Sequence, residues 1–240
     1  MLSPDRRQAL LASIDRSDGR TVDLLELCSA GAELTEVSGA SIMLMTGDEP
    51  QAALCCTDAV SELIEEFQFT YGEGPCIDAH HHRRPVLEPD LAEPATSRWP
   101  AFSRAAVQAG ARAVFGFPIH VGPVQLGALN LYRTTAASLT TTQHDDAAAV
   151  ADSSARVIIA TQTNATPGSL GVELEPGAAL RFVVHQATGM VAAQLDVTVA
   201  EALVRLRAYA FAHDQLIVDV AEDVVARRTR LSVDGEHHPD

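Results

Sequence analysis

The four cysteines are the most reactive side chains in this chain: Cys28, Cys55, Cys56 and Cys76. A thiol senses redox state only when nearby cations lower its pKa, and a buried unpaired cysteine is more often simply a small packed residue. Both readings stay open for Cys76. Cys55 and Cys56 are adjacent, so their side chains point apart if this segment is a strand. Four cysteines in 240 residues do not make a disulfide framework, and we expect free thiols in a reducing cytoplasm.

Three consecutive histidines, His80–His82, invite a metal or haem proposal. Metal ligands must converge on one point, whereas consecutive side chains diverge on any regular backbone. Two arginines follow directly, so the run is typical of a polar loop. We therefore expect no metal and no cofactor. Because the sequence also contains no phosphate-binding loop, zinc-protease motif or nucleophile elbow, we expect no enzymatic activity.

Arginine supplies all 17 basic residues of the chain, against 32 acidic ones, for a net charge of -15. This balance excludes a protein that binds nucleic acid through a basic surface spread over the whole molecule. It does not exclude a small nucleic-acid-binding module within an acidic chain. Arg205 and Arg207 stand two residues apart on a predicted helix and point in different directions. Guanidinium groups suit phosphates and the unstacked bases of RNA loops, yet exposed helical arginines are often merely solvated.

The elements that position these residues fall into two groups. Residues 1–163 predict an α+β domain in which helices flank an antiparallel sheet. Its predicted helices cover 4–14, 21–34, 100–110 and 142 to about 160, and its predicted strands cover 40–45, 113–121 and 126–132. Thr142 and Asp145 predict a capping box at the start of the last helix. A linker rich in proline and glycine is predicted at 164–177.

Residues 178–231 predict a small all-α domain of three short helices, followed by an acidic disordered tail at 232–240. Apolar residues from Leu180 to Leu195 form one stripe at helical spacing, and Thr198 with Glu201 forms a capping box for the second helix. The stripe of that second helix includes Val199. Because so few residues enclose only a marginal core, we expect the domain to form a dimer or to dock on the first domain.

The first domain resembles a GAF domain, a sensor fold. The resemblance rests on an ordered set of stretches at 72–78, 84–87, 99–102, 110–119 and 125–132, and it covers roughly residues 20 to 162. It implies a small-molecule ligand of unknown identity beneath the loops that cover the sheet. We expect Cys76, Asp78 and Trp99 to lie at that ligand site.

The last helices resemble an ANTAR domain, the RNA-binding module of transcription antiterminators. The matching pieces lie at 181–189, 201–202, 206–207, 210 and 219–221, and the order GAF then ANTAR is typical of actinobacterial regulators. The resemblance implies binding to tandem hairpins in nascent RNA. The RNA contacts that it implies are Arg181, Gln186, Thr188, Gly189, Arg205 and Arg207. This sequence departs from the family at Thr188, where lysine is usual.

Together these features predict a cytoplasmic, homodimeric antiterminator that senses a small ligand or redox state. No signal peptide is recognised at the start, and no apolar run approaches the ~18 residues of a membrane span. Two alternatives stay open. A GAF-fold enzyme could reduce free methionine sulfoxide with Cys76 and either Cys55 or Cys56. The helical module could instead survive as a dimerisation element that has lost RNA binding, as Thr188 suggests.

Overall fold

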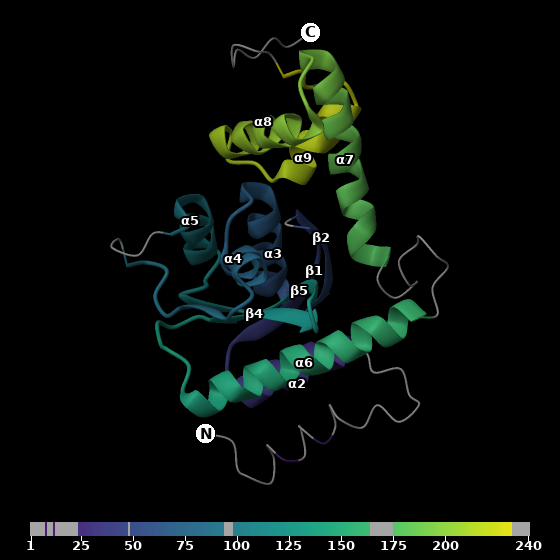
Figure 1. The fold of residues 1–240 in the computed structure, drawn as a ribbon. Coiled ribbons are helices and arrows are strands. Elements are labelled where there is room, and N and C mark those ends of the chain that lie inside the picture. The colour runs from purple at the N-terminus through teal and green to yellow at the C-terminus, as the bar shows by residue number, and fades with distance from the viewer. Residues whose placement is uncertain are drawn as a thin grey trace.

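The computed structural model describes residues 8, 12, 24–47, 49–93, 98–163 and 175–231. The predicted helix at 4–14 lies outside the described residues apart from Gln8 and Ala12, as do residues 164–174 of the predicted linker and the tail at 232–240. Figure 1 shows the described part as a sheet between two layers of helices, with a group of three helices at one end.

The sheet has five strands in the order β2-β1-β5-β4-β3, and every neighbouring pair is antiparallel. The strands are β1 (Gly39–Thr46), β2 (Glu49–Cys56), β3 (Val86–Glu88), β4 (Ala113–Val121) and β5 (Val124–Arg133). The predicted strands correspond to β1, β4 and β5, and the turn between β4 and β5 falls at Gly122 and Pro123 as their sequence indicates. The α+β fold class is thereby confirmed.

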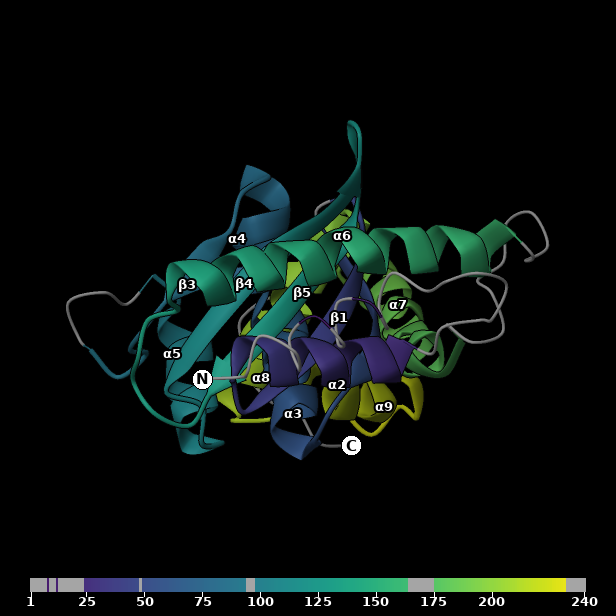
Figure 2. The same ribbon diagram turned by 90° about the horizontal axis from the view of Figure 1, so that it is seen from below.

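Two helices, α2 (Leu24–Thr35) and α6 (Thr141–Thr163), cover one face of the sheet and lie side by side (Figure 2). They pack on the buried apolar residues that alternate along the strands, among them Ile42, Leu129 and Leu131. The capping box of α6 lies two residues before the predicted one: Gln143 N donates to Thr140 Oγ1 at 3.2 Å, and Thr140 N donates to Gln143 Oε1 at 3.0 Å.

Three helices cover the other face: α3 (Ala59–Tyr71), α4 (Pro75–His82) and α5 (Pro100–Gln108). Asp58 begins α3 with a capping box, because its carboxylate accepts from the backbone N–H groups of Val60 and Ser61, both at 2.9 Å. The backbone of α4 lies directly on β4: a Cβ on Gly116 would come within 2.5 Å of the carbonyl oxygen of Pro75. Only glycine permits this close approach.

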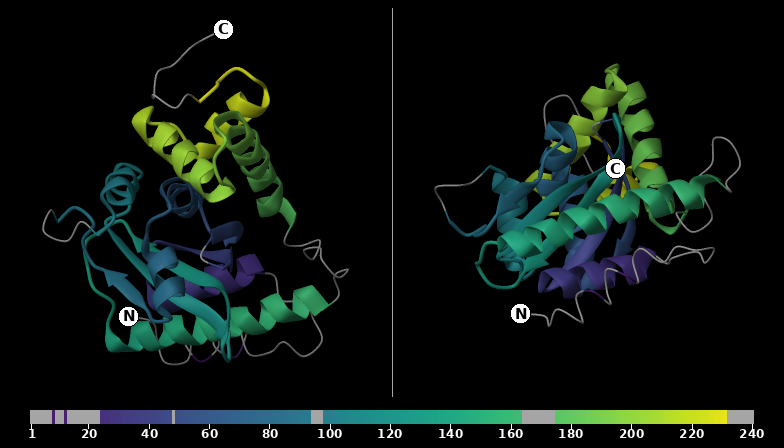
Figure 3. Two further views of the ribbon diagram at one scale, coloured as in Figure 1. Left: turned by 45° about the horizontal axis from the view of Figure 1, so that its top comes forward. Right: turned by 60° about the horizontal axis from the view of Figure 1, so that its bottom comes forward.

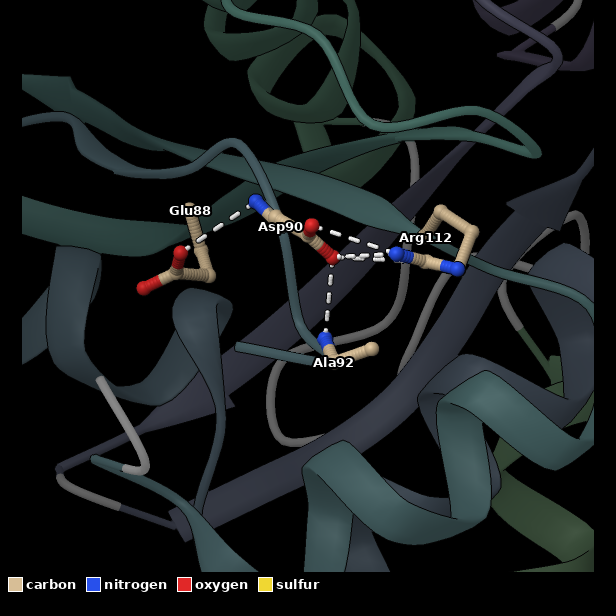
Figure 4. A network of polar contacts seen from close by, with 4 residues as sticks. All are labelled: Glu88, Asp90, Ala92 and Arg112. Atoms are coloured by element: carbon tan, nitrogen blue, oxygen red, sulfur yellow. Dashed lines mark hydrogen bonds and ion pairs between the residues drawn. The ribbon is translucent and has the colours of Figure 1, made fainter. Parts of the chain in front are cut away.

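The segment after β3 is fixed by one carboxylate (Figure 4). Asp90 accepts hydrogen bonds from Arg112 Nη2 at 2.8 Å and from Ala92 N at 3.1 Å, while its own N–H donates to Glu88 Oε1 at 3.3 Å. The hydrogen bond from Arg112 holds the pKa of Asp90 below its ordinary value. This carboxylate therefore holds the segment that follows β3 to Arg112, the residue that precedes β4.

The remaining helices, α7 (Glu175–Leu195), α8 (Val199–Ala212) and α9 (Ile217–Val225), form a helical module on the side of the sheet that carries α3 (Figures 1 and 3). Its buried core contains the predicted apolar residues Val184, Ala187, Val191, Ala202, Leu206, Ala210, Ile217, Val220, Ala221 and Val224. Val199 was predicted in this core and is instead 63% exposed. It is the first residue of α8, and the buried residues of that helix begin at Ala202.

Among the described residues, no single helix is long and apolar enough to cross a membrane, although a bent pair, Phe182–Leu195 with Val199–Ala212, meets the length and composition criteria across its 105° break.

Candidate nucleic-acid interface

One side of α7 is a continuous exposed stripe. Its members stand at the spacing i, i+3, i+4, i+7 and i+11 and comprise Phe182, His185, Gln186, Gly189 and Ala193. Two of the predicted RNA contacts, Gln186 and Gly189, lie on this α7 stripe. Open space surrounds the position that a Cβ of Gly189 would take, so another backbone can approach the helix closely there. The side chain of Arg181 lies outside the described residues.

Thr188 is turned away from the α7 stripe. Its side chain is 2% exposed, and Oγ1 donates to the carbonyl oxygen of Val184 at 2.7 Å. The hydroxyl is therefore satisfied within its own helix. The expectation that Thr188 contacts RNA requires an accessible side chain, and the structure corrects it because the side chain is buried. A lysine at this position would not point to the surface in this arrangement, so its replacement by threonine does not remove an exposed phosphate contact.

Arg205 and Arg207 have separate partners, in keeping with their spacing along α8. Arg205 Nη2 donates to Glu201 Oε1 at 3.1 Å, one turn earlier on the same helix. Such surface pairs contribute little, so Arg205 can exchange Glu201 for another anion. Arg207 instead reaches the first domain, where Nε donates to the carbonyl oxygen of Phe69 at 3.3 Å. The structure thus does not place the two guanidinium groups at one site.

The last turn of α3 and its cap, residues Phe69–Gly72, contact the helical module and are called here the α3 seat. The Phe69 ring belongs to the buried core of the module. Thr70 Oγ1 accepts from Ile217 N at 3.3 Å, which satisfies a donor at the start of α9, where Leu216 offers no side-chain cap. Tyr71 meets Phe211 edge-to-face with ring centroids 6.0 Å apart. In this structure the second domain is therefore docked on the first, which is one of the two arrangements predicted from its small size.

Immediately before the α3 seat, α3 turns two buried polar side chains toward the sheet. The Glu65 carboxylate accepts from Ser41 Oγ on β1 and from Gln68 Nε2 at 3.2 Å. Gln68 Oε1 in turn accepts from Cys76 N, at the start of α4, at 2.8 Å. Asn130 lies opposite Ser41 in the neighbouring strand, and its buried Oδ1 has no hydrogen-bond partner. We call this polar group (Ser41, Glu65, Gln68, Cys76 and Asn130) the sensor interior.

The three residues predicted at the GAF ligand site do not form one group. Asp78 and Trp99 are in contact, since Asp78 Oδ2 accepts from Trp99 Nε1 at 3.1 Å and from Arg98 Nη2 at 2.8 Å. These bonds tie α4 to the segment before α5. Cys76 lies one half-turn earlier in α4 and belongs to the sensor interior instead.

Two of the cysteines are joined, contrary to the expectation of free thiols: Cys28 in α2 is disulfide-bonded to Cys55 in β2. Residue composition could not reveal this pair, because the two positions come together only when α2 packs on the sheet. Cys55 and Cys56 do point apart, as alternation along a strand requires. Cys55 is therefore unavailable as a partner for Cys76.

The two unpaired thiols, Cys56 and Cys76, are held in the neutral form. Burial raises the pKa of both, and the carboxylate of Glu65 raises each further. Neither thiol has the lowered pKa of a reactive or redox-sensing cysteine.

The histidine run is helical, not the predicted loop, because α4 extends through His82. His80 is buried and its Nε2 is 2.7 Å from the carbonyl oxygen of Gly47, so it ties α4 to the turn between β1 and β2. Across the described portion of the chain, no group of three or more potential ligands converges on a metal site.

Comparison with known proteins assigns the two parts. Residues 174–225 match the model of the ANTAR domain family. The fold of the first part is similar to that of the GAF domain from a phosphoenolpyruvate-protein phosphotransferase of Coxiella burnetii, with a TM-score of 0.50 and 14% identity over 66% of this chain and 94% of that chain. No curated protein sequence matches the chain. The chain thus combines a GAF-like domain with an ANTAR domain.

Two further solved structures are similar at lower scores. The GAF domain of an Acinetobacter phosphoenolpyruvate-protein phosphotransferase gives a TM-score of 0.48 at 13% identity, over 68% of this chain and 98% of that one. The free methionine-R-sulfoxide reductase of Neisseria meningitidis gives 0.44 at 17% identity, over 69% and 96%.

Proposed function

We propose that this protein is a transcription antitermination regulator that binds hairpins in nascent RNA through its ANTAR domain. The observation that carries the proposal is the match of residues 174–225 to that domain, following a GAF-like sensor fold. We assign RNA binding to residues 178–231, sensing to 1–163 and the connection to 164–177. The last three residues of that connection, 175–177, form the first turn of α7. The α7 stripe supports the proposal because Gln186 and Gly189 are exposed on it, with room for a nucleic-acid backbone.

The proposal is tested by binding of the full-length protein to a synthetic RNA of two tandem hairpins, with a scrambled RNA as control, at two salt concentrations. Selective binding that weakens with salt is expected, because arginine–phosphate contacts release counterions. Gln186→Glu together with Gly189→Glu places two negative charges on the α7 stripe and should weaken binding at least about tenfold, since like charges repel the phosphates.

Val124→Glu is the matched control, because Val124 is 57% exposed on the hairpin between β4 and β5, far from the helical module in sequence. It should leave the affinity unchanged. Equal binding of tandem-hairpin and scrambled RNA would contradict the proposal. Absence of binding would favour the alternative in which the module acts only in dimerisation, a state that light scattering of the same samples would detect.

We further propose that the GAF-like domain senses a small ligand or redox state. The unpaired Oδ1 of Asn130 supports a ligand that carries a hydrogen-bond donor, since a buried acceptor without a partner is costly. The disulfide of Cys28 and Cys55 supports a redox input. RNA affinity compared before and after reduction of this disulfide distinguishes the two inputs, because only a redox sensor should respond.

We propose no catalysed reaction. The neutral, buried state of Cys76 supports this, and so does the bond of Cys55 to Cys28, because a reductase of this kind needs a reactive thiolate and a resolving thiol. A thioredoxin-coupled assay with free methionine sulfoxide tests the statement. Turnover that Cys76→Ser abolished would overturn it.

A further inference from the structure

The α3 seat contributes to the helical module both a side chain of its core and a hydrogen-bond acceptor. The Phe69 ring is 2% exposed and packs in the module's core, and Thr70 supplies the acceptor that the start of α9 lacks. Separation of the two domains would therefore expose an aromatic ring to water and break the hydrogen bond at the start of α9. Both costs favour the docked arrangement.

In the docked arrangement Arg207 is engaged by the first domain. Its guanidinium lies over the C-terminal end of α3, where backbone carbonyls carry partial negative charge. Gly72 makes room for it: a Cβ on Gly72 would stand 3.0 Å from Arg207 Nη1 and 3.1 Å from Cζ. The guanidinium that resemblance assigns to RNA thus occupies a site on α3.

The same helix connects this site to the sensor interior. Glu65 and Gln68 bond to β1 and α4 within the first domain, and the α3 seat begins at the next residue, Phe69. A helix turn is a stiff hydrogen-bonded unit, so a shift of α3 that follows a change in the sensor interior must move the seat as well.

We propose that the α3 seat is an intramolecular restraint on RNA binding: while docked it withholds Arg207 from RNA, and displacement of α3 by an event in the sensor interior releases the module. This inference rests on the proposed function and specifies how that function is regulated. The restrained and released forms differ in affinity for RNA, so by reciprocity RNA binding also favours release.

Gly72→Asn tests the restraint. Asn tolerates the left-handed conformation of Gly72 (φ 66°), so α3 keeps its end, while the larger side chain fills the space of the Arg207 guanidinium. Gly47→Asn is the matched control, because Gly47 has φ 59° and open space around its Cβ position. Undocking is measured without RNA by hydrogen exchange of the Ile217 amide, which donates to Thr70.

Gly72→Asn should speed exchange of that amide at least about tenfold and raise affinity for tandem-hairpin RNA by about 5- to 150-fold, the usual range for coupling between two sites. The control should change neither. Faster exchange with unchanged or weaker RNA binding would overturn the restraint and leave the proposed function standing. Absence of RNA binding by the native protein and both variants would contradict the proposed function, and this inference with it.

If Gly72→Asn leaves the exchange rate unchanged, Tyr71→Asp is the second wedge. It removes the edge contact with Phe211 and places a carboxylate near Asp214, whose charge already acts on Tyr71. Undocking by this variant without a gain in RNA affinity would equally overturn the restraint.

Discussion

Arg207 and Phe69 stand 138 residues apart in sequence, yet Arg207 Nε donates to the Phe69 carbonyl oxygen over 3.3 Å. The same Phe69 directs its ring into the core of the ANTAR domain. One residue of the GAF-like domain therefore supplies both an apolar and a polar contact to the helical module. The two domains are joined by shared packing as well as by the chain that connects them.

Phe69→Ala should lower the free energy of unfolding of the helical module by about 3–5 kcal/mol, because truncation of a buried aromatic residue leaves a cavity. Two probes report on different domains: Trp99, the sole tryptophan, follows the first domain, and far-ultraviolet circular dichroism follows all helices. In urea the two transitions should coincide for the native protein and separate in the variant. Val124→Ala, at an exposed position, should change stability by less than about 0.5 kcal/mol.

Thr188→Lys should destabilise the protein and leave RNA affinity no higher. The position is buried, and an ammonium group without a partner is costly there; a loss of about 3 kcal/mol or more is expected. Urea denaturation measures the loss. An unchanged stability with tighter RNA binding would show that residue 188 faces outward in solution.

Cys28→Ser with Cys55→Ser should reduce the free energy of unfolding by about 2–4 kcal/mol under oxidising conditions, because the bond constrains the unfolded chain. Titration of the denatured, unreduced native protein should find two thiols, from Cys56 and Cys76, and four after reduction. Four thiols before reduction would refute the pairing.

Alkaline pH should destabilise the protein. The pKa of Cys76 is raised above its ordinary 9.0 in the folded state, so above pH 9 the unfolded chain loses this proton first. The contribution is fully present below pH 9 and declines above it, by up to about 1.4 kcal/mol per pH unit. Cys76→Ala should therefore show a shallower decline between pH 9 and 10.5 in chemical denaturation. Parallel curves would indicate that Cys76 titrates normally.

The sequence predicts the elements with a clear apolar period and misses those without one. The three helices of the module and the hairpin of β4 and β5 follow directly from spacing. Helix α3 is not predicted, because Glu65 and Gln68 occupy its buried side and these polar residues interrupt the apolar stripe. The helix on which the module docks is thus one that the sequence pattern does not predict.

Long-range relationships are the other part that the sequence could not supply. The small size of the helical module indicates that it docks on another surface, but no local sequence pattern predicts that Phe69 and Gly72 form this surface. Gly72 does carry a signal, since glycine is the residue most often found in the left-handed cap at the end of a helix. The neighbours of Cys28 and the inward turn of Thr188 likewise depend on packing between elements distant in sequence.

The position of the α3 seat also orders events during synthesis. A ribosome that adds about 5–20 residues per second completes Phe69 roughly 7–28 s before it reaches Arg207, 138 residues later. The first domain ends with α6 at Thr163, before any residue of the helical module, so its chain is complete first and it can fold first. We therefore expect each newly made module to fold against a first domain that is already complete.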